Sequence, residues 1–420
     1  MTIGRKRFIL GAVTATALLA GAVAQAADKV ELKLWMTGVG VDKYMKDSIV
    51  PAFEKENPGV TVTATNLSWS SYSQKILTGI AANDGPDVFS FYSVDVAPWA
   101  ARGVLDALDG KVDANLFIPS ALANGQWDGK IYALPIGLRM RPLFYRADFL
   151  KSAGFDKPPA TWEELRAYAN KLVKKDAGGN VERVGFWVPT NHPYKTVQMW
   201  LTFLWNAGGE VFSADGKKAV FNSPEGVEAT QFLADLIRAD KVDVPGAIKV
   251  DNVDFAQGRV AMLVSNIVTR DLIKNFPALK PDVGIAMVPG KKAQYVEFSG
   301  DMIGIAKGSK HPVEAAKLIN FIAARPEIAL KYYAIDQNMP SLKSLVDSDF
   351  VKNDPWIATY LKFVDKARPL PAHPRWTEIA SVLTKALDSV YIEGQPAKAA
   401  LDQAATAANA ILARPRRPEP

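Results

Sequence analysis

Two polar residues follow a short apolar segment, in a position that suits ligand binding. Residues 87–92 read Asp-Val-Phe-Ser-Phe-Tyr. A short, apolar and aromatic run of this kind is typical of a strand that is buried on both faces. Ser93 and Asp95 come directly after it, and in open α/β sheets ligands bind at the carboxyl ends of the strands. The alternative is that Asp95 only caps the helix that is expected to follow.

Acid-base catalysis and metal binding are the other kinds of chemistry that these residue types allow. Asp95 and Asp301 could form the acid and base pair of a hydrolase, although nothing in the sequence fixes their separation. His192, His311 and His373 are far apart and each precedes a proline, so loop and helix-start roles are favoured over a metal site. There is no cysteine, which excludes disulfides, thiolate catalysis and cysteine metal sites. We expect no cofactor.

The first 26 residues predict export. Basic residues at positions 5–7 precede an apolar run rich in alanine and leucine at 8–24, and Ala24-Gln25-Ala26 matches the small-x-small cleavage site of a signal peptide. The run is shorter than the roughly 20 strongly apolar residues that a membrane span needs, which disfavours an anchor. With no cysteine to carry a lipid, we expect cleavage after Ala26 and a soluble protein in a bacterial periplasm.

Charge and length limit the partners and the number of domains. Loss of residues 1–26 deletes three positive charges, so the net charge falls from +6 to +3. This surplus is too small to predict nucleic-acid binding. The Arg-rich end, residues 413–420, is broken by prolines and is interpreted as a frayed tail. The remaining chain is longer than one core usually organises, so we expect two domains in a monomer.

The order of the expected elements indicates an α/β fold. Strands are expected at 30–36, 60–64 and 87–92, with helices between them at 43–56 and 72–82. This alternation predicts a mostly parallel sheet with right-handed crossovers. Further on, the run from Ile131 through Gly137 to Tyr145 indicates a long strand that passes from one domain to the next. Thr161 and Glu164 have the spacing of a capping box at the start of a helix.

Seven short motifs recur in a recognisable order along the chain. They are residues 53–60, 85–88, 128–135, 158–165, 206–209, 258–262 and 307–310. Each motif is weak alone, because most of them form turns and helix starts. Their order and spacing resemble those of the family 1 extracellular solute-binding proteins of ABC importers, which include maltose-binding protein. The resemblance runs from the signal peptide to about residue 412.

This resemblance implies an α/β periplasmic binding protein fold with two lobes. Each lobe would be a mostly parallel sheet flanked by helices, and two or three hinge crossovers would join the lobes. The N-terminal lobe would take residues 27–138 and 289–340, and the C-terminal lobe 139–288 and 341–412. A carbohydrate would bind between the lobes, and the closed form would deliver it to the membrane permease subunits.

The resemblance also places a set of residues in the cleft. By position they are Thr37, Trp69, Asp95, Arg139, Gln198, Asn266, Gly300, Asp301, Met302, Arg375 and Trp376. Such residue types suit a sugar because aromatic faces stack on its C–H side, while carboxylates, amides and guanidinium groups bind its hydroxyls.

The chain departs from the maltose-binding pattern at two positions. Arg139 stands where a carboxylate is expected, and Val268 stands where a tryptophan is expected, so a preference for maltodextrins does not follow. Four arginines fall at or near the expected cleft positions: Arg139, Arg141, Arg270 and Arg375. Because guanidinium groups bind carboxylate, phosphate or sulfonate, one interpretation is an anionic sugar ligand. The other is that these arginines pair with Asp95 or Asp301 or face solvent.

The sequence therefore supports three hypotheses about function. The leading hypothesis is the substrate-binding component of an ABC importer, which captures a carbohydrate in the periplasm and performs no chemistry. The first alternative is a binding protein for an anionic sugar derivative, namely a sugar acid, phosphate or sulfonate. The second alternative is an exported carbohydrate-active enzyme that uses Asp95 and Asp301.

Overall fold

The computed structural model describes residues 1–2, 29–38, 41–192, 194–266, 275–277, 282–336 and 338–415. Almost all of the predicted signal peptide, Val268, Arg270 and most of the predicted tail lie outside these residues.

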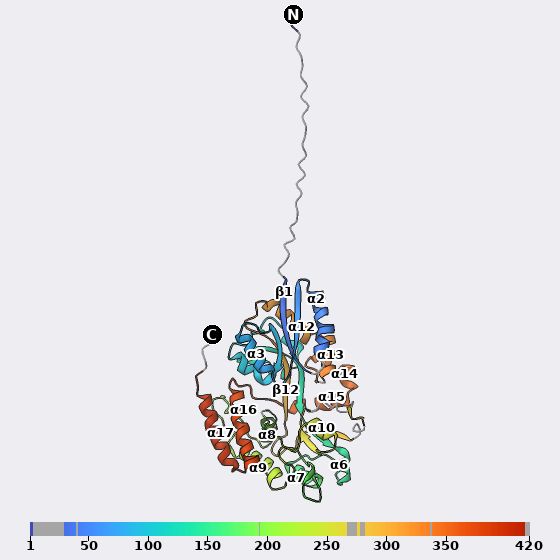
Figure 1. Cartoon of the computed structure of the whole chain (residues 1–420), viewed down its shortest axis with the longest axis vertical. Helices are drawn as coiled ribbons and strands as arrows, with labels where there is room; N and C mark the ends of the chain where they lie inside the picture. Colours follow the sequence, from blue (N-terminus) through green and yellow to red (C-terminus); the bar gives the residue numbers. More distant parts are fainter. Residues whose placement is uncertain are drawn as a thin grey trace.

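A six-stranded mixed sheet organises the upper half of the molecule (Figure 1). Its strands are β1 (Val30–Thr37), β2 (Val60–Leu67), β3 (Val88–Tyr92), β6 (Ala133–Arg141), β12 (Val296–Ile305) and β13 (Ala367–Pro369). They run in the order β13-β12-β3-β1-β2, with β6 also paired to β12. The predicted parallel pairing of β1 with β2 and β3 is confirmed, whereas β12 returns antiparallel to β3 and β6.

Helices cover both faces of this sheet. Figure 1 shows α3 (Tyr72–Ala81) on one side of β1 and β12, and α2 (Val50–Glu56) and α13 (Pro326–Asp336) on the other. One core joins apolar residues of β1 to α2 and α12 (Pro312–Ala323), and a second joins β3 to α3. Strand β3 is buried along almost its whole length, as its continuous apolar pattern predicts.

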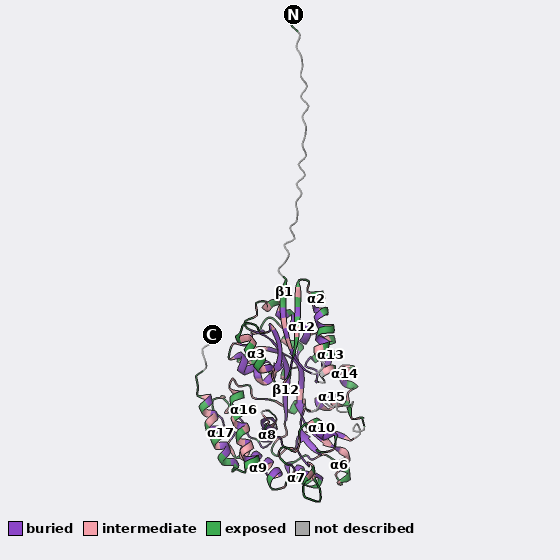
Figure 2. Cartoon of the chain, viewed as in Figure 1, coloured by how far each residue is buried: buried purple, intermediate pink, exposed green. Residues whose placement is uncertain are grey.

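The lower half is built around a smaller sheet of β7 (Leu143–Arg146), β10 (Met262–Val264) and β11 (Val283–Ala286), in the order β10-β7-β11. Both pairings are antiparallel, so the expectation of a mostly parallel sheet in each lobe is wrong for these three strands. Around it lie α7 (Trp162–Leu172), α8 (Lys195–Asn206), α9 (Pro224–Arg238), α16 (Trp376–Asp388) and α17 (Ala397–Leu412). Helix α8 is buried along almost its entire length (Figure 2). Trp200 and Trp205 both belong to this core.

The long antiparallel pair of β6 and β12 runs between the two halves (Figure 1). Its register places Arg141 opposite Glu297 and Arg139 opposite Ser299. Because side chains alternate along a strand, Glu297, Ser299 and Asp301 share one face of β12. The pair of strands therefore presents a polar face in the middle of the molecule. Residue 137 of β6 is glycine for a steric reason, since an added Cβ would lie 2.3 Å from the Asn338 amide nitrogen.

Candidate functional site

The carboxyl end of β3 carries a buried carboxylate, as the sequence predicts. Asp95 is only 7% exposed, and its Oδ2 accepts a hydrogen bond of 2.5 Å from the Tyr72 hydroxyl. Burial raises the pKa of Asp95 to about 6, against the lowering effect of that hydrogen bond. Asp95 also occupies the N-cap position of α4 (Val96–Ala100), but its side chain makes no capping hydrogen bond. The capping interpretation therefore does not explain its carboxylate.

Thr37, at the end of the neighbouring β1, has a structural role in this edge of the sheet. Its backbone N–H donates to Ser90 Oγ at 2.7 Å, and the two hydroxyl oxygens are 2.8 Å apart. Both residues are completely buried. These contacts join the end of β1 to the middle of β3.

Two ion pairs lie on the polar face of β6 and β12. The Arg139 guanidinium donates to Asp301 Oδ2 at 2.7 Å, and the Asn338 amide donates to the same oxygen at 3.1 Å. The Arg141 Nε lies 2.8 Å from Glu297 Oε2, although the two groups are not aligned as a hydrogen bond. Glu297 is completely buried, and burial raises its pKa while the charge of Arg141 opposes that rise. The interpretation that Arg139 pairs with Asp301 is confirmed.

Gln198 connects α8 to this polar face. Its amide nitrogen donates to the Tyr92 hydroxyl at 3.3 Å, and that hydroxyl donates to Ser299 Oγ at 2.6 Å. Gln198 is 4% exposed, and its Oε1 is buried with no hydrogen-bond partner among the described residues. An unpaired buried acceptor costs about 1–3 kcal/mol, so this oxygen is available to a ligand donor.

A third cation, Lys195, lies at the start of α8 and is also paired. Its Nζ is 2.9 Å from Asp251 Oδ2, which also accepts a hydrogen bond from the Ser265 hydroxyl at 3.0 Å. Burial, followed by the positive charges of Lys195 and Arg141, lowers the pKa of the neighbouring His192 to about 4. The His192 Nδ1 accepts the backbone N–H groups of Tyr194 and Lys195 at the start of α8. This imidazole is therefore neutral at pH 7.

We name these groups the central polar cluster. It consists of Tyr92, Asp95, Arg139, Arg141, Lys195, Gln198, Asp251, Glu297, Ser299 and Asp301. The sequence predicted Asp95, Arg139, Gln198 and Asp301 but not Tyr92, Lys195, Asp251 or Glu297. A signal for Glu297 did exist, because Glu297, Ser299 and Asp301 alternate along a strand whose residues are all buried.

Three further predicted residues, Trp69, Asn266 and Gly300, lie in different parts of the structure. Trp69 is half-buried, with its ring 5.4 Å from that of Tyr72, and Asn266 is half-buried beside Ser265. The backbone N–H of Gly300 donates to the Ser93 hydroxyl at 3.2 Å. These three positions remain predictions for ligand binding.

Two of the predicted residues have contacts that account for them without a ligand. Met302 is completely buried in the apolar core that includes Phe91 and Trp99, because it points to the opposite face of β12 from Asp301. The Arg375 guanidinium bonds to Glu378 and to the carbonyl oxygens of residues 414 and 415. We therefore retain neither residue as a ligand contact.

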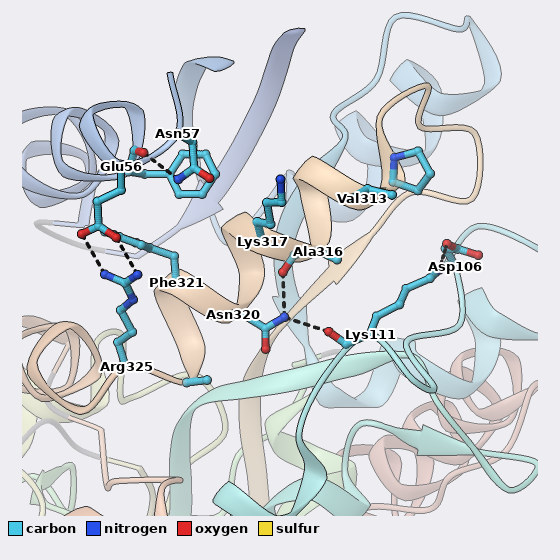
Figure 3. A pocket seen from close by; sticks show the side chains of 13 residues that line it. Glu56, Asn57, Asp106, Lys111, Val313, Ala316, Lys317, Asn320, Phe321 and Arg325 are labelled. Atoms are coloured by element: carbon cyan, nitrogen blue, oxygen red, sulfur yellow. Dashed lines mark hydrogen bonds and ion pairs between the residues drawn. The ribbon is translucent and has the colours of Figure 1, made fainter. Parts of the chain in front are cut away.

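Trp376 lines a pocket between the two halves of the molecule. The pocket has a volume of about 490 Å³, and its walls include Val94 beside Asp95, Tyr194 at the start of α8, and one face of α16. A larger groove of about 710 Å³ lies elsewhere, along α12, and the rim of that groove carries the paired charges of Glu56 and Arg325 (Figure 3).

Comparisons with known proteins decide the family. Residues 38–327 match the family described as bacterial extracellular solute-binding proteins. The chain belongs to this family. A Brucella abortus protein described only as a binding protein is 30% identical to this solute-binding protein over 414 residues, which cover 94% of this chain and 97% of the relative.

Two further similarities concern proteins with named ligands. The sn-glycerol-3-phosphate-binding periplasmic protein UgpB of Escherichia coli K12 is 25% identical over 409 residues, covering 88% of this chain and 89% of the relative. The maltose-bound MalE3 protein of T. maritima superposes with a TM-score of 0.77 and 25% identity, covering 91% of this chain and 100% of that chain. The fold is therefore the α/β periplasmic binding protein fold.

Family membership also decides between binding and catalysis. Solute-binding proteins capture ligands for ABC importers and are not enzymes, so the hypothesis of an acid and base pair at Asp95 and Asp301 is wrong. Asp301 is instead paired with Arg139. Among the residues that the structure describes, no group of three or more His, Asp or Glu side chains is placed to hold a metal ion. Within the same residues, the helices are all too short or too polar to cross a membrane.

Proposed function

We propose that this solute-binding protein captures a neutral carbohydrate between two lobes and delivers it to the permease of its ABC importer. The lobes are residues 27–138 with 289–340, and 139–288 with 341–412. The protein acts as a monomer in the periplasm after cleavage of its signal peptide at Ala26. The contacts between the halves at Tyr92 and Gln198 support a ligand site at this boundary.

The observation that supports a neutral ligand is the pairing of charges in the central polar cluster. Arg139, Arg141 and Lys195 each contact a carboxylate, those of Asp301, Glu297 and Asp251 respectively. A phosphate or carboxylate ligand would have to displace one of these partners and leave a buried charge unpaired, which is strongly unfavourable. The open acceptor of Gln198 instead suits a donor such as a sugar hydroxyl.

A second candidate is an anionic ligand such as a sugar phosphate or sn-glycerol 3-phosphate. The relatives that bind sn-glycerol 3-phosphate favour it. The predicted contact Arg270 lies outside the described residues. Its charge is therefore not part of the pairing described above.

A thermal-shift screen separates the two candidates. The purified protein is heated with neutral mono- and oligosaccharides, sugar acids, sugar phosphates and sn-glycerol 3-phosphate. Saturation at about a hundred times Kd stabilises the folded state by about 2.7 kcal/mol, so a true ligand raises the melting temperature by several degrees. We expect neutral sugars to give this shift. A shift with anionic compounds alone would contradict the proposal and favour the second candidate.

A further inference from the structure

Three segments of the chain pass between the upper and lower halves and lie side by side at one place. Strand β6 leads from the upper half into the lower half, and β12 leads back (Figure 1). The third segment, 338–341, leads from α13 toward α14 (Asp349–Lys352) and α15 (Pro355–Leu361). Tyr360 of α15 belongs to one apolar core with Phe144 of β7 and Leu263 of β10, in the lower half. We call these three segments the crossovers.

The carboxylate of Asp301 contacts both of the other crossovers. Asp301 lies on β12, and its Oδ2 accepts hydrogen bonds from Arg139 of β6 at 2.7 Å and from the Asn338 amide at 3.1 Å. Asp301 is 1% exposed and Asn338 is 2% exposed, so water competes little for these contacts. Hydrogen bonds to a charged group are among the stronger ones in proteins. We call Asp301, Arg139 and Asn338 the Asp301 cluster, because this one carboxylate ties the three crossovers together.

The backbones of the crossovers also approach closely at the Asp301 cluster. Leu138 and Met339 exchange two backbone hydrogen bonds, of 3.1 and 3.0 Å. A Cβ added to Gly300 would lie 2.8 Å from the Gly137 carbonyl oxygen, so β12 and β6 are in close contact there. The three crossovers are therefore packed against one another at the level of the cluster.

The regular pairing of β6 with β12 is interrupted at the same place. Asp301 is opposite Gly137, whereas Met302 is opposite Pro135, so Ile136 is an extra residue on β6. A bulge of this kind disrupts the ladder of hydrogen bonds and bends the strand that carries the extra residue. The crossovers are therefore suited to bend at the Asp301 cluster, where side-chain contacts supplement an interrupted backbone ladder.

A tie between the crossovers limits how the two halves can be oriented. If the crossovers bend independently, the separated halves can twist and rock as well as close, and each added orientation raises the conformational entropy of the open form. This entropy is lost when the halves close around a ligand. Crossovers that are tied to one another bend together, which removes these additional orientations in advance.

We propose that Asp301, Arg139 and Asn338 are positioning residues that make the three crossovers bend as one hinge. The Asp301 cluster thereby narrows the range of orientations that the two lobes take in the ligand-free protein. This inference rests on the division into two lobes proposed above, and it does not depend on the chemistry of the ligand.

Spin labels on the two lobes measure this range of orientations directly. The chain contains no cysteine, so Lys75→Cys on α3 and Lys171→Cys on α7 provide two unique labelling sites, both at exposed positions. Double electron–electron resonance then gives the distribution of distances between the labels. The measurement uses the whole mature protein without any ligand.

Asn338→Leu releases the third crossover and keeps the pair of Arg139 with Asp301, so neither buried charge loses its partner. We expect the distance distribution to become about twice as wide as in the unchanged protein, because the loss of the tie adds orientations to the ensemble. Asn338→Ala also lacks the amide donor and is smaller than asparagine, so it should broaden the distribution equally. This second variant separates the loss of the tie from any steric effect of leucine.

Asn320→Leu is the matched control. The Asn320 amide donates to the Lys111 carbonyl oxygen at 3.0 Å, so it also ties two segments of the chain, but both belong to the upper lobe (Figure 3). Its loss should leave the distance distribution unchanged. A general loosening of the fold would instead broaden the distribution in this variant as well.

The outcomes separate this inference from the proposed function. An unchanged width in Asn338→Leu and Asn338→Ala would overturn the role of the Asp301 cluster, and so would equal broadening by Asn320→Leu. A thermal shift with anionic compounds alone would contradict the neutral ligand, but it would not alter this comparison, since no ligand is added.

Discussion

The effect of Glu297 on stability depends on its ion-pair partner, Arg141. Its carboxylate is completely buried and lies 2.8 Å from the Arg141 Nε. Replacing one member of a buried ion pair leaves the other charge without compensation, at a cost of about 3–5 kcal/mol. We therefore expect Glu297→Gln to lower the free energy of unfolding by that amount, as measured by urea denaturation.

An exposed ion pair provides the control for this substitution. Glu56 makes a similar contact with Arg325 at 2.7 Å, but both side chains are largely in solvent. Such pairs contribute about 0–1 kcal/mol, so Glu56→Gln should change stability little. Equal effects of the two substitutions would show that the Arg141 pair is solvated.

Gln198 is expected to affect ligand binding more than folding. Its Oε1 is buried and has no hydrogen-bond partner in the part of the chain that the structure describes, so Gln198→Leu removes no contact of that oxygen there. Loss of a hydrogen bond to the ligand should weaken binding about tenfold to a hundredfold, as measured by calorimetry. Gln231→Leu, at an exposed position of α9, should leave affinity unchanged. Unchanged affinity in Gln198→Leu would place the ligand elsewhere.

At the scale of the element, the start of α7 tests a feature that the sequence predicted. Thr161 Oγ1 accepts the Glu164 backbone N–H at 3.2 Å, as a capping box requires, while Glu164 Oε2 accepts the N–H of Ala160 rather than that of Thr161. Thr161→Ala should lower the free energy of unfolding by about 1 kcal/mol in denaturant titrations. Thr161→Ser retains the acceptor and should have little effect. A neutral Thr161→Ala would mean that α7 is held by packing alone.

Elements were predictable from the sequence wherever local chemistry decides them. The apolar run of β3 and the cap at Thr161 lie at their predicted places, because burial and capping depend on neighbouring residues. The antiparallel return of β12 was not predicted, since nothing local specifies which strand it joins. Met302 was misassigned to the cleft for the same reason, because the face of β12 that it occupies depends on the register of that strand.

The central polar cluster could be predicted only in part, because it joins segments that are distant in the sequence. Arg141 meets Glu297 across β6 and β12, and Lys195 meets Asp251 from separate helices. The arginines alone allowed two interpretations, an anionic ligand or internal pairing. Only the tertiary arrangement identifies their partners.

At the scale of the whole molecule, buried carboxyl groups predict a loss of stability as pH rises. Burial raises the pKa of Asp243 to about 7, against hydrogen bonds from the N–H groups of Val188 and Val244, and the pKa of Asp95 to about 6. In the unfolded chain both are near about 4, so the folded protein binds these protons more tightly. Their contribution to the free energy of unfolding is complete below about pH 4 and is lost as the pH rises to about 7.

Denaturation at several pH values checks this dependence. Asp243→Asn should reduce the fall in the free energy of unfolding between about pH 5 and 7, because the titrating group is gone. Asp128→Asn, at an exposed turn, is the control and should leave the slope unchanged. His192 has the opposite sign, since its lowered pKa makes its contribution disappear as the pH falls from about 6.5 toward 4. An unaltered slope in Asp243→Asn would show that Asp243 is ionised in the folded protein.

The pairing of Arg139, Arg141 and Lys195 with carboxylates has a consequence for the surroundings in which the protein works. Attraction between exposed charges is screened by dissolved ions beyond about 8–10 Å at moderate ionic strength. At the central polar cluster, where we propose that the ligand binds, these three cations are already neutralised, so no such attraction is lost. The affinity for the ligand should therefore change little with ionic strength, which suits a protein that is exposed to the salt concentration outside the cytoplasm.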